Sequence, residues 1–186
     1  MERIQVYLMA LKFSKQEMQK MEDLIKNFIE TMGIKIVVPV DIFKLATDLG
    51  FDVRGAEFEE QLDGILIVNE YVDKIEMFNK NKIIAYNCLK DIDAKKFIVA
   101  HELAHYICEK TNAHDKKIVT AARDHKDGYS SNEQEQRMDY IAASLLIPKD
   151  DLIEFIKNRD NVTAQVAKRY KVPQELAQRR IEEVRA

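Results

Sequence analysis

The pattern of hydrophobic and polar residues shows two periodicities, and each predicts a different kind of element. Apolar residues recur every three or four positions in segments that predict helices at 15–31, 41–49, 91–110, 130–146, 149–157, 163–170 and 174–184. Shorter segments rich in β-branched and aromatic residues predict strands at 51–54, 65–68, 74–78 and 82–87. We therefore expect an α+β fold in which a small antiparallel sheet packs on the helix at 91–110, with the strands at 65–68, 74–78 and 82–87 joined as a meander.

The helix at 91–110 carries the most informative stretch, the H-E-x-x-H motif His101-Glu102-Leu103-Ala104-His105. Residues four apart lie on one face of a helix, so His101 and His105 can direct both imidazoles toward one metal ion. Glu102 lies about 100° round the helix from His101 and can act as general base on a water at that metal. The alternative is a pair of ordinary core histidines, but two of them flanking a glutamate at this spacing favour a metal site.

A catalytic zinc takes three protein ligands and keeps a fourth position for water. The pattern H-E-x-x-H-x-x-G-x-x-H is excluded, because Cys108 and Thr111 stand at its Gly and His positions. Cys108 shares the histidine face but lies roughly 10 Å along the axis from His101, too far to complete the same site. The third ligand must therefore come from another element.

The predicted helix at 130–146 supplies a candidate for the third ligand. It begins with a capping-box pattern, Ser130 with Glu133, so Glu133 is interpreted as a solvated residue. Glu135 lies beside the apolar arc of this helix, and Asp139, four residues later, is placed to accept a hydrogen bond from a ligand imidazole. H-E-x-x-H followed by E-x-x-x-D is the gluzincin arrangement, with both histidines and Glu135 as ligands. The alternative for Glu135 is an ordinary surface carboxylate.

These two helices resemble those of the ImmA/IrrE-type metallopeptidases. The apolar run 97–100 (Phe-Ile-Val-Ala) directly precedes His101, and the second helix then follows the family's order with Glu135, Met138, Asp139, Ile-Ala-Ala at 141–143 and Leu-Leu-Ile-Pro at 145–148. The upstream helix at 41–49 and the pair Asp63-Gly64 before a strand fit as well, so the resemblance extends from about residue 39 onward. Three departures, at Ala104, Met138 and Ile141, remove no chemical group.

The resemblance implies a cytoplasmic, zinc-dependent endopeptidase with one Zn²⁺ per chain and Mn²⁺ as the alternative metal in the cell. It implies a protein substrate, a helix-turn-helix transcriptional repressor whose cleavage releases genes of mobile elements, prophages or stress responses. Two other classes stay open. One is a DNA-binding regulator in which the metal is structural; the other is a non-proteolytic protein that binds a repressor through a sheet edge and the methionine-rich helix at 15–31. Glu102 argues against the second class, because a pure binder needs no base there.

Composition agrees with an intracellular globular protein. The 186 residues suffice for a compact core, and the net charge of −3 argues against a strongly DNA-binding body. No stretch is apolar enough to span a membrane, and charges at Glu2, Arg3 and Lys12 exclude a secretory signal at the start. Cys88 and Cys108 both sit in apolar surroundings, which indicates reduced thiols.

The segment 111–129 between the two site helices is polar and predicts a loop over or beside the cleft. It contains His114, His125 and Tyr129, any of which could stabilise an oxyanion, although solvated loop residues are the favoured interpretation.

The chain divides into a zincin-like domain with the first amphipathic helix, 1–148, and a helical subdomain, 149–186. In the second part, Asn161 or Thr163 is expected to cap a helix, and 166–176 resembles a helix-turn-helix core that lacks the usual Gly in its turn. Arg179, Arg180 and Arg185 make the last helix basic, as a DNA-reading helix would be. We favour a helical cap that packs on the zincin or grips the substrate.

Overall fold

The computed structural model describes residues 13–58, 62–69, 80–111, 120–121 and 133–185. Its first half contains helices α2 (Lys15–Thr31) and α3 (Ile42–Asp48), strands β1 (Asp52–Ala56), β2 (Gly64–Val68) and β3 (Lys82–Asn87), and helix α4 (Ile92–Thr111). Its second half contains strand β4 (Thr120–Ala121) and helices α5 (Glu133–Leu146), α6 (Lys149–Ile156), α7 (Thr163–Tyr170) and α8 (Gln174–Arg185). The α+β class is confirmed.

The sheet is mixed and has the order β1-β3-β2-β4. Strand β2 is antiparallel to both of its neighbours, as expected, but β1 runs parallel to β3. The expectation of an antiparallel sheet is therefore wrong for β1, because alternation along a strand does not encode the direction of its partner. Strand β4 lies within the segment expected to be a loop and pairs with Leu66 and Ile67 of β2. The strand expected at 74–78 lies outside the described residues.

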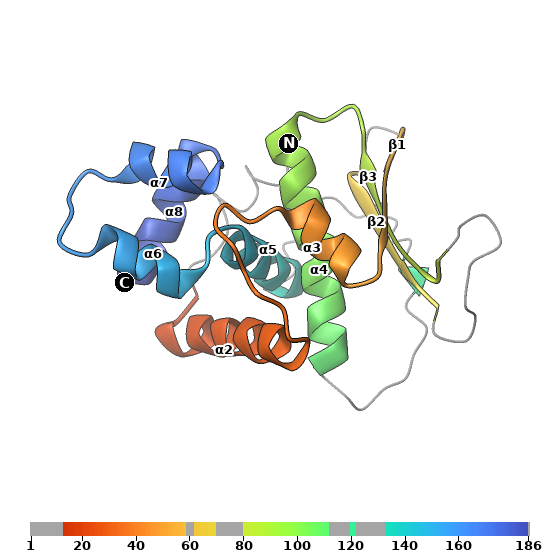
Figure 1. Cartoon of the computed structure of the whole chain (residues 1–186), viewed down its shortest axis with the longest axis horizontal. Helices are drawn as coiled ribbons and strands as arrows, with labels where there is room; N and C mark the ends of the chain where they lie inside the picture. Colours follow the sequence, from red (N-terminus) through yellow and green to blue (C-terminus); the bar gives the residue numbers. More distant parts are fainter. Residues whose placement is uncertain (1–12, 59–61, 70–79, 112–119, 122–132, 186) are drawn as a thin grey trace.

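Helix α4 occupies the centre of the molecule. It contacts β2 and β3 on one side and helices α2, α3 and α5 on the others (Figure 1). Its N-terminus is capped by Asp91, whose Oδ1 accepts a hydrogen bond from the Ala94 amide at 2.8 Å. Residues 97–104 are all buried, which explains why the helix is apolar almost all round. His101 therefore stands inside the core, and His105, one turn later, is half-buried.

The start and end of α2 are set by local sequence. Ser14 and Glu17 form a capping box, and Gly33 follows the helix with a φ of +63°. Of the expected methionine-rich stripe, Met18 and Met21 are buried, whereas Met32 is exposed. The helix bounds are those expected from the sequence.

The C-terminal helices pack on this body through α8, which contacts α5, α6 and α7. Arg180 of α8 is completely buried and lies 2.9 Å from both Glu22 of α2 and Glu183 of α8. Arg179 pairs with the same Glu183, and Arg185 donates to a backbone carbonyl. Two of the three arginines of the expected basic helix therefore pair with carboxylates, and only Arg185 of the three is exposed.

One local expectation for this region, the cap of the helix that begins near residue 163, is wrong. Helix α7 begins after Val162 without a side-chain cap, so neither Asn161 nor Thr163 caps it; Thr163 donates instead to Gln178 of α8. Lys171 adopts the left-handed conformation, with φ of 53° and ψ of 53°, at the end of α7. A lysine thus takes the place of the glycine that such turns usually contain. The division of the chain at residue 148 stays a prediction.

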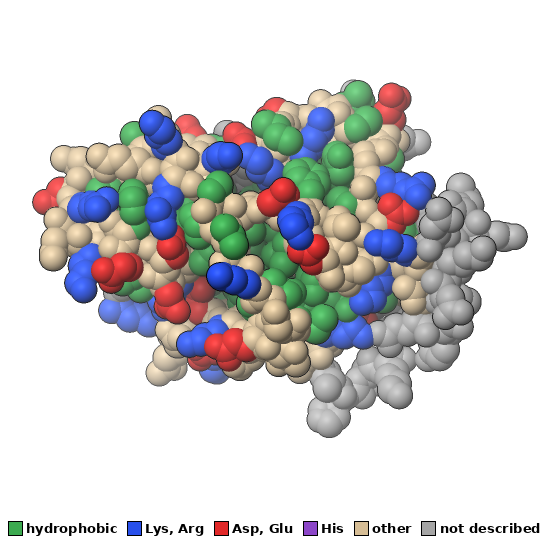
Figure 2. Space-filling view, viewed as in Figure 1, with side chains coloured by type: hydrophobic (Ala, Val, Ile, Leu, Met, Phe, Trp, Pro, Cys, Tyr) green, Lys and Arg blue, Asp and Glu red, His purple; other side chains and the backbone are tan. Residues whose placement is uncertain are grey.

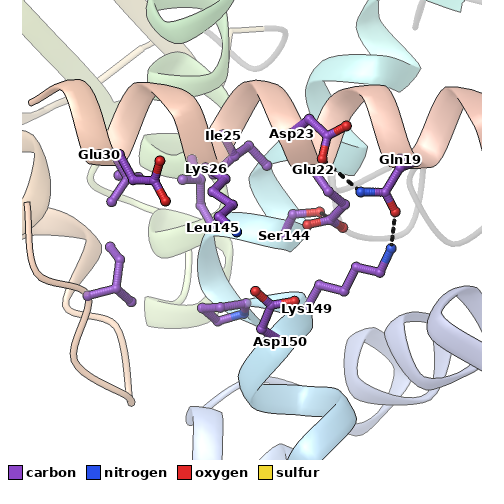
Figure 3. Close-up of a pocket in the computed structure, with 13 residues that line it drawn as sticks. Gln19, Glu22, Asp23, Ile25, Lys26, Glu30, Ser144, Leu145, Lys149 and Asp150 are labelled. Carbon is purple, nitrogen blue, oxygen red and sulfur yellow. Dashed lines mark hydrogen bonds between the residues drawn. The ribbon is translucent and has the colours of Figure 1, made fainter.

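A groove of about 460 Å³ opens between α2, the C-terminal end of α5 and the start of α6 (Figure 3). Leu145 lines it from α5, and Ile25 and Ile29 line it from α2. In the space-filling view, hydrophobic side chains gather in the middle of this face, above α2 (Figure 2). None of the helices in the described part of the chain combines the length and apolarity that a membrane-spanning segment requires.

Candidate metal centre

Helices α4 and α5 bring three potential ligands together. The Nε2 atoms of His101 and His105 lie 3.0 Å apart, and Glu135 Oε2 lies 3.2 Å from the first and 3.5 Å from the second. Among the described residues, these three form the one group of side chains found that could hold a metal ion. The sequence predicted the helix on which each of the three residues lies. The spacing of four between the histidines and the position of Glu135 beside an apolar arc are both local properties of a helix.

The spacing of the three donor atoms fits a tetrahedral metal. Ligand bonds of roughly 2.0–2.1 Å at tetrahedral angles place ligand atoms about 3.3 Å from one another. The observed separations of 3.0, 3.2 and 3.5 Å bracket that value. One ion could therefore contact all three atoms without a change of backbone, and the donor set of two imidazoles and a carboxylate suits zinc.

Asp139 lies behind His101, one helical turn after Glu135 on α5. Its Oδ1 lies 2.7 Å from His101 Nδ1, and both side chains are buried. A carboxylate there can accept a hydrogen bond from Nδ1–H, and Nε2 is then the ring nitrogen that faces Glu135 and His105 and is left for a metal. The contact holds the ring orientation and favours the Nδ1–H tautomer that a metal ligand needs.

The protonation states also suit metal binding. Burial lowers the pKa of His105, which favours the neutral imidazole. For Glu135, burial raises the pKa, but hydrogen bonds and charge interactions with the two histidines outweigh burial and hold the pKa well below its ordinary value. A neutral imidazole and an ionised carboxylate are the forms that coordinate metals.

Glu102 lies on the sheet side of the histidines. Its side chain is buried, with only 6% exposed, and no group in the described part of the chain hydrogen-bonds its carboxylate. The carboxylate lies over Gly64, the first residue of β2, at a distance of 3.0 Å from the position that a Cβ atom there would occupy. It is therefore available to exchange a proton with a molecule at the metal position.

The remaining residues suggested by the sequence do not join this group. Glu133 is exposed and pairs with Arg137, as expected for a solvated residue. Cys108 is half-buried, and burial raises the pKa of its thiol to about 11. Both cysteines are free thiols, which confirms the expectation from composition. His114, His125, Tyr129 and Ser130 lie outside the described residues.

Two features behind the site were missed from the sequence. On the face of α5 opposite to Glu135, Tyr140 and Ser144 both donate to Glu22 Oε1, at 2.9 and 3.1 Å. Glu22 comes from α2, more than a hundred residues earlier, so no local pattern could reveal this contact. The second feature is Gly64, which the sequence places at the start of a strand without indicating a role for it.

The comparisons with known proteins agree with this arrangement. A family model for the IrrE N-terminal-like domain, Peptidase_M78, matches residues 46–182. A search of curated proteins gave no match. The matched region contains β1 to β4, both site helices and most of the C-terminal helices. The chain therefore belongs to the ImmA/IrrE family of metallopeptidases.

Proposed function

We propose that the chain is a zinc-dependent endopeptidase in which His101, His105 and Glu135 hold the metal and Glu102 is the general base. The observation that carries the proposal is the triangle of donor atoms at tetrahedral spacing, 3.0 to 3.5 Å apart, next to a buried glutamate. A structural zinc site is normally closed by four protein ligands, whereas three ligands leave a position for water and substrate. Manganese is the alternative ion for the same donors.

The residues divide the chemistry between them. When bound, zinc would supply Lewis-acid polarisation of the peptide carbonyl and acidify water at the open position. Glu102 takes a proton from the attacking water and then gives it to the leaving amine, because its carboxylate has no hydrogen-bond partner in the described part of the chain. Asp139 holds the His101 ring in place through the 2.7 Å contact to Nδ1. Glu135 supplies the third ligand atom, Oε2, from α5.

The proposed substrate is a cytoplasmic helix-turn-helix transcriptional repressor, and the support for it is the family resemblance. An extended peptide could add to the sheet by main-chain pairing beside the short edge strand β4. We do not assign DNA binding to the C-terminal helices, because Arg180 is buried and Arg179 is paired with Glu183.

Metal analysis of purified protein tests the proposal. We expect near one zinc per chain in the wild type and in Glu133→Ala, a control on the same helix, and a sharp fall in Glu135→Ala. Absence of metal from wild type after reconstitution with zinc would refute the peptidase assignment. Glu102→Gln should keep the metal and lose hydrolysis of the repressor; near-normal cleavage would remove Glu102 from the role of base.

A further inference from the structure

We propose that Gly64 is a positioning residue for Glu102: the absence of a side chain there leaves the space in which the Glu102 carboxylate is seated. The inference rests on the proposed function, because it concerns the base of that reaction. Gly64 is the first residue of β2 and pairs with Tyr86 of β3. It lies on the face of β2 that is turned to α4, together with the buried Leu66 and Val68.

Space, and not backbone conformation, is what requires glycine at this position. Among the described glycines, positive φ angles occur at Gly33 and Gly50, so Gly64 has a backbone that any residue could adopt. A Cβ atom at Gly64 would lie 2.5 Å from Ile98 Cγ2, 3.0 Å from Glu102 Oε1 and 3.3 Å from the Ala85 carbonyl oxygen. Two of these three atoms belong to α4, and one of them is the proposed base.

The neighbouring atoms differ in how readily they can move. The start of β2 is held by the Asn87 amide, which donates to the Asp63 carbonyl at 2.8 Å, and by the ion pair of Asp63 with Lys90 at 3.1 Å. Ile98 is buried and β-branched, so its side chain has little rotamer freedom on a helix. Glu102 has a longer, more flexible side chain without a hydrogen-bond partner in the described ranges, so it is the group that yields.

An added methyl group would therefore act in two separable ways. Relief of the 2.5 Å contact with Ile98 needs a displacement of roughly 1 Å of α4 relative to the sheet, and a misplacement of that size can cost on the order of 100-fold in rate. Displacement of the Glu102 carboxylate would remain even if Ile98 were shortened. None of the three atoms nearest to the added group belongs to the proposed metal ligands His101, His105 and Glu135.

The test uses full-length protein loaded with Co²⁺ and titrated with acetohydroxamic acid, followed by the visible cobalt spectrum. A hydroxamate chelates the metal and gives its proton to the adjacent carboxylate, so its affinity reports where Glu102 lies. We expect Gly64→Ala to bind Co²⁺ at wild-type stoichiometry and to weaken hydroxamate binding by about tenfold or more, as for a lost hydrogen bond to a charged group. Gly55→Ala is the matched control, since its Cβ would meet Cys88 and Tyr86 but not Glu102.

The same substitution in an Ile98→Ala background separates positioning from packing. In that background, Gly64→Ala should lower the Tm by less than it does in the wild type, because the 2.5 Å contact with Ile98 is gone, but it should still weaken hydroxamate binding. Unchanged hydroxamate affinity in Gly64→Ala, or full recovery of affinity together with Tm in the Ile98→Ala background, would overturn the inference alone. Failure of the wild type to bind Co²⁺ would instead overturn the proposed function, and the inference with it.

Discussion

Asp139 offers the most direct quantitative test of how the protein prepares its metal ligands. We predict that Asp139→Ala weakens zinc binding more than Asp139→Asn, and that both leave the fold intact. The aspartate is buried against the fully buried His101, with 2.7 Å between Oδ1 and Nδ1. Asn keeps a neutral oxygen that can accept the hydrogen bond, whereas Ala removes the acceptor.

The size of the two effects follows from the type of hydrogen bond. A buried hydrogen bond to a charged group contributes about 1.5–3 kcal/mol, which corresponds to roughly 10- to 100-fold in affinity. A charge-assisted bond is roughly twice as strong as a neutral one, so Asn should retain about half of that free energy. We therefore expect a loss of zinc affinity of about 5- to 10-fold for Asn and on the order of 100-fold for Ala, the range usual for residues that orient metal ligands.

Competition with a chromophoric chelator at fixed pH measures the zinc Kd of each variant. Glu133→Gln is the control, because Glu133 is an exposed carboxylate on the same helix that pairs with Arg137. Zinc affinity of Asp139→Ala within twofold of wild type would refute the reasoning. So would an Asn variant weaker than Ala, because charge and hydrogen bonding would then not explain the role of Asp139.

Three further outcomes are expected. Glu22→Ala should lower the free energy of unfolding by about 3 kcal/mol, because the buried Arg180 loses a carboxylate partner at 2.9 Å. Glu30→Ala on the same helix should change it by less than about 0.5 kcal/mol, and thermal unfolding compares the two variants. Cys108 should react slowly with iodoacetamide at pH 8 until the protein is unfolded in urea, since burial raises its pKa to about 11. Peptide mass spectrometry measures the labelling, and a fast reaction in the native state would contradict this prediction. Burial lowers the pKa of His105 in the folded protein. Below the ordinary pKa of 6.5, the unfolded chain therefore binds a proton that the folded chain does not. The Tm of metal-free protein should fall as the pH falls below 6.5, and His105→Gln should reduce that dependence.

The candidate site could be predicted from the sequence because its geometry is almost entirely helical. The spacing of His101 and His105 and the spacing of Glu135 and Asp139 each fix a shared helix face before any tertiary contact is known. What the sequence could not supply was the distance between the two helices. The structure gives it, through the 2.7 Å contact of Asp139 with His101.

The sheet was predicted less well for a physical reason. The positions of β2 and β3 follow from their composition, but strand order and direction depend on contacts distant in sequence. Strand β1 pairs with β3 across a gap of about 30 residues, in parallel register from Asp52 with Ile83 onward. Strand β4 has only two residues, too few for a periodicity to appear.

Helix α5 shows how long-range contacts support a site that local patterns define. One face carries Glu135 and Asp139 toward α4, and the opposite face carries Tyr140 and Ser144 toward Glu22 of α2. Glu22 is also the partner of the buried Arg180, so α2, α5 and α8 meet at one carboxylate. A helix held by hydrogen bonds on both faces has little freedom to rotate about its axis, and such a rotation would separate Glu135 from the histidines. The polar residues behind α5, which look misplaced on an apolar helix, are therefore consistent with a metal site that must be formed before the metal arrives.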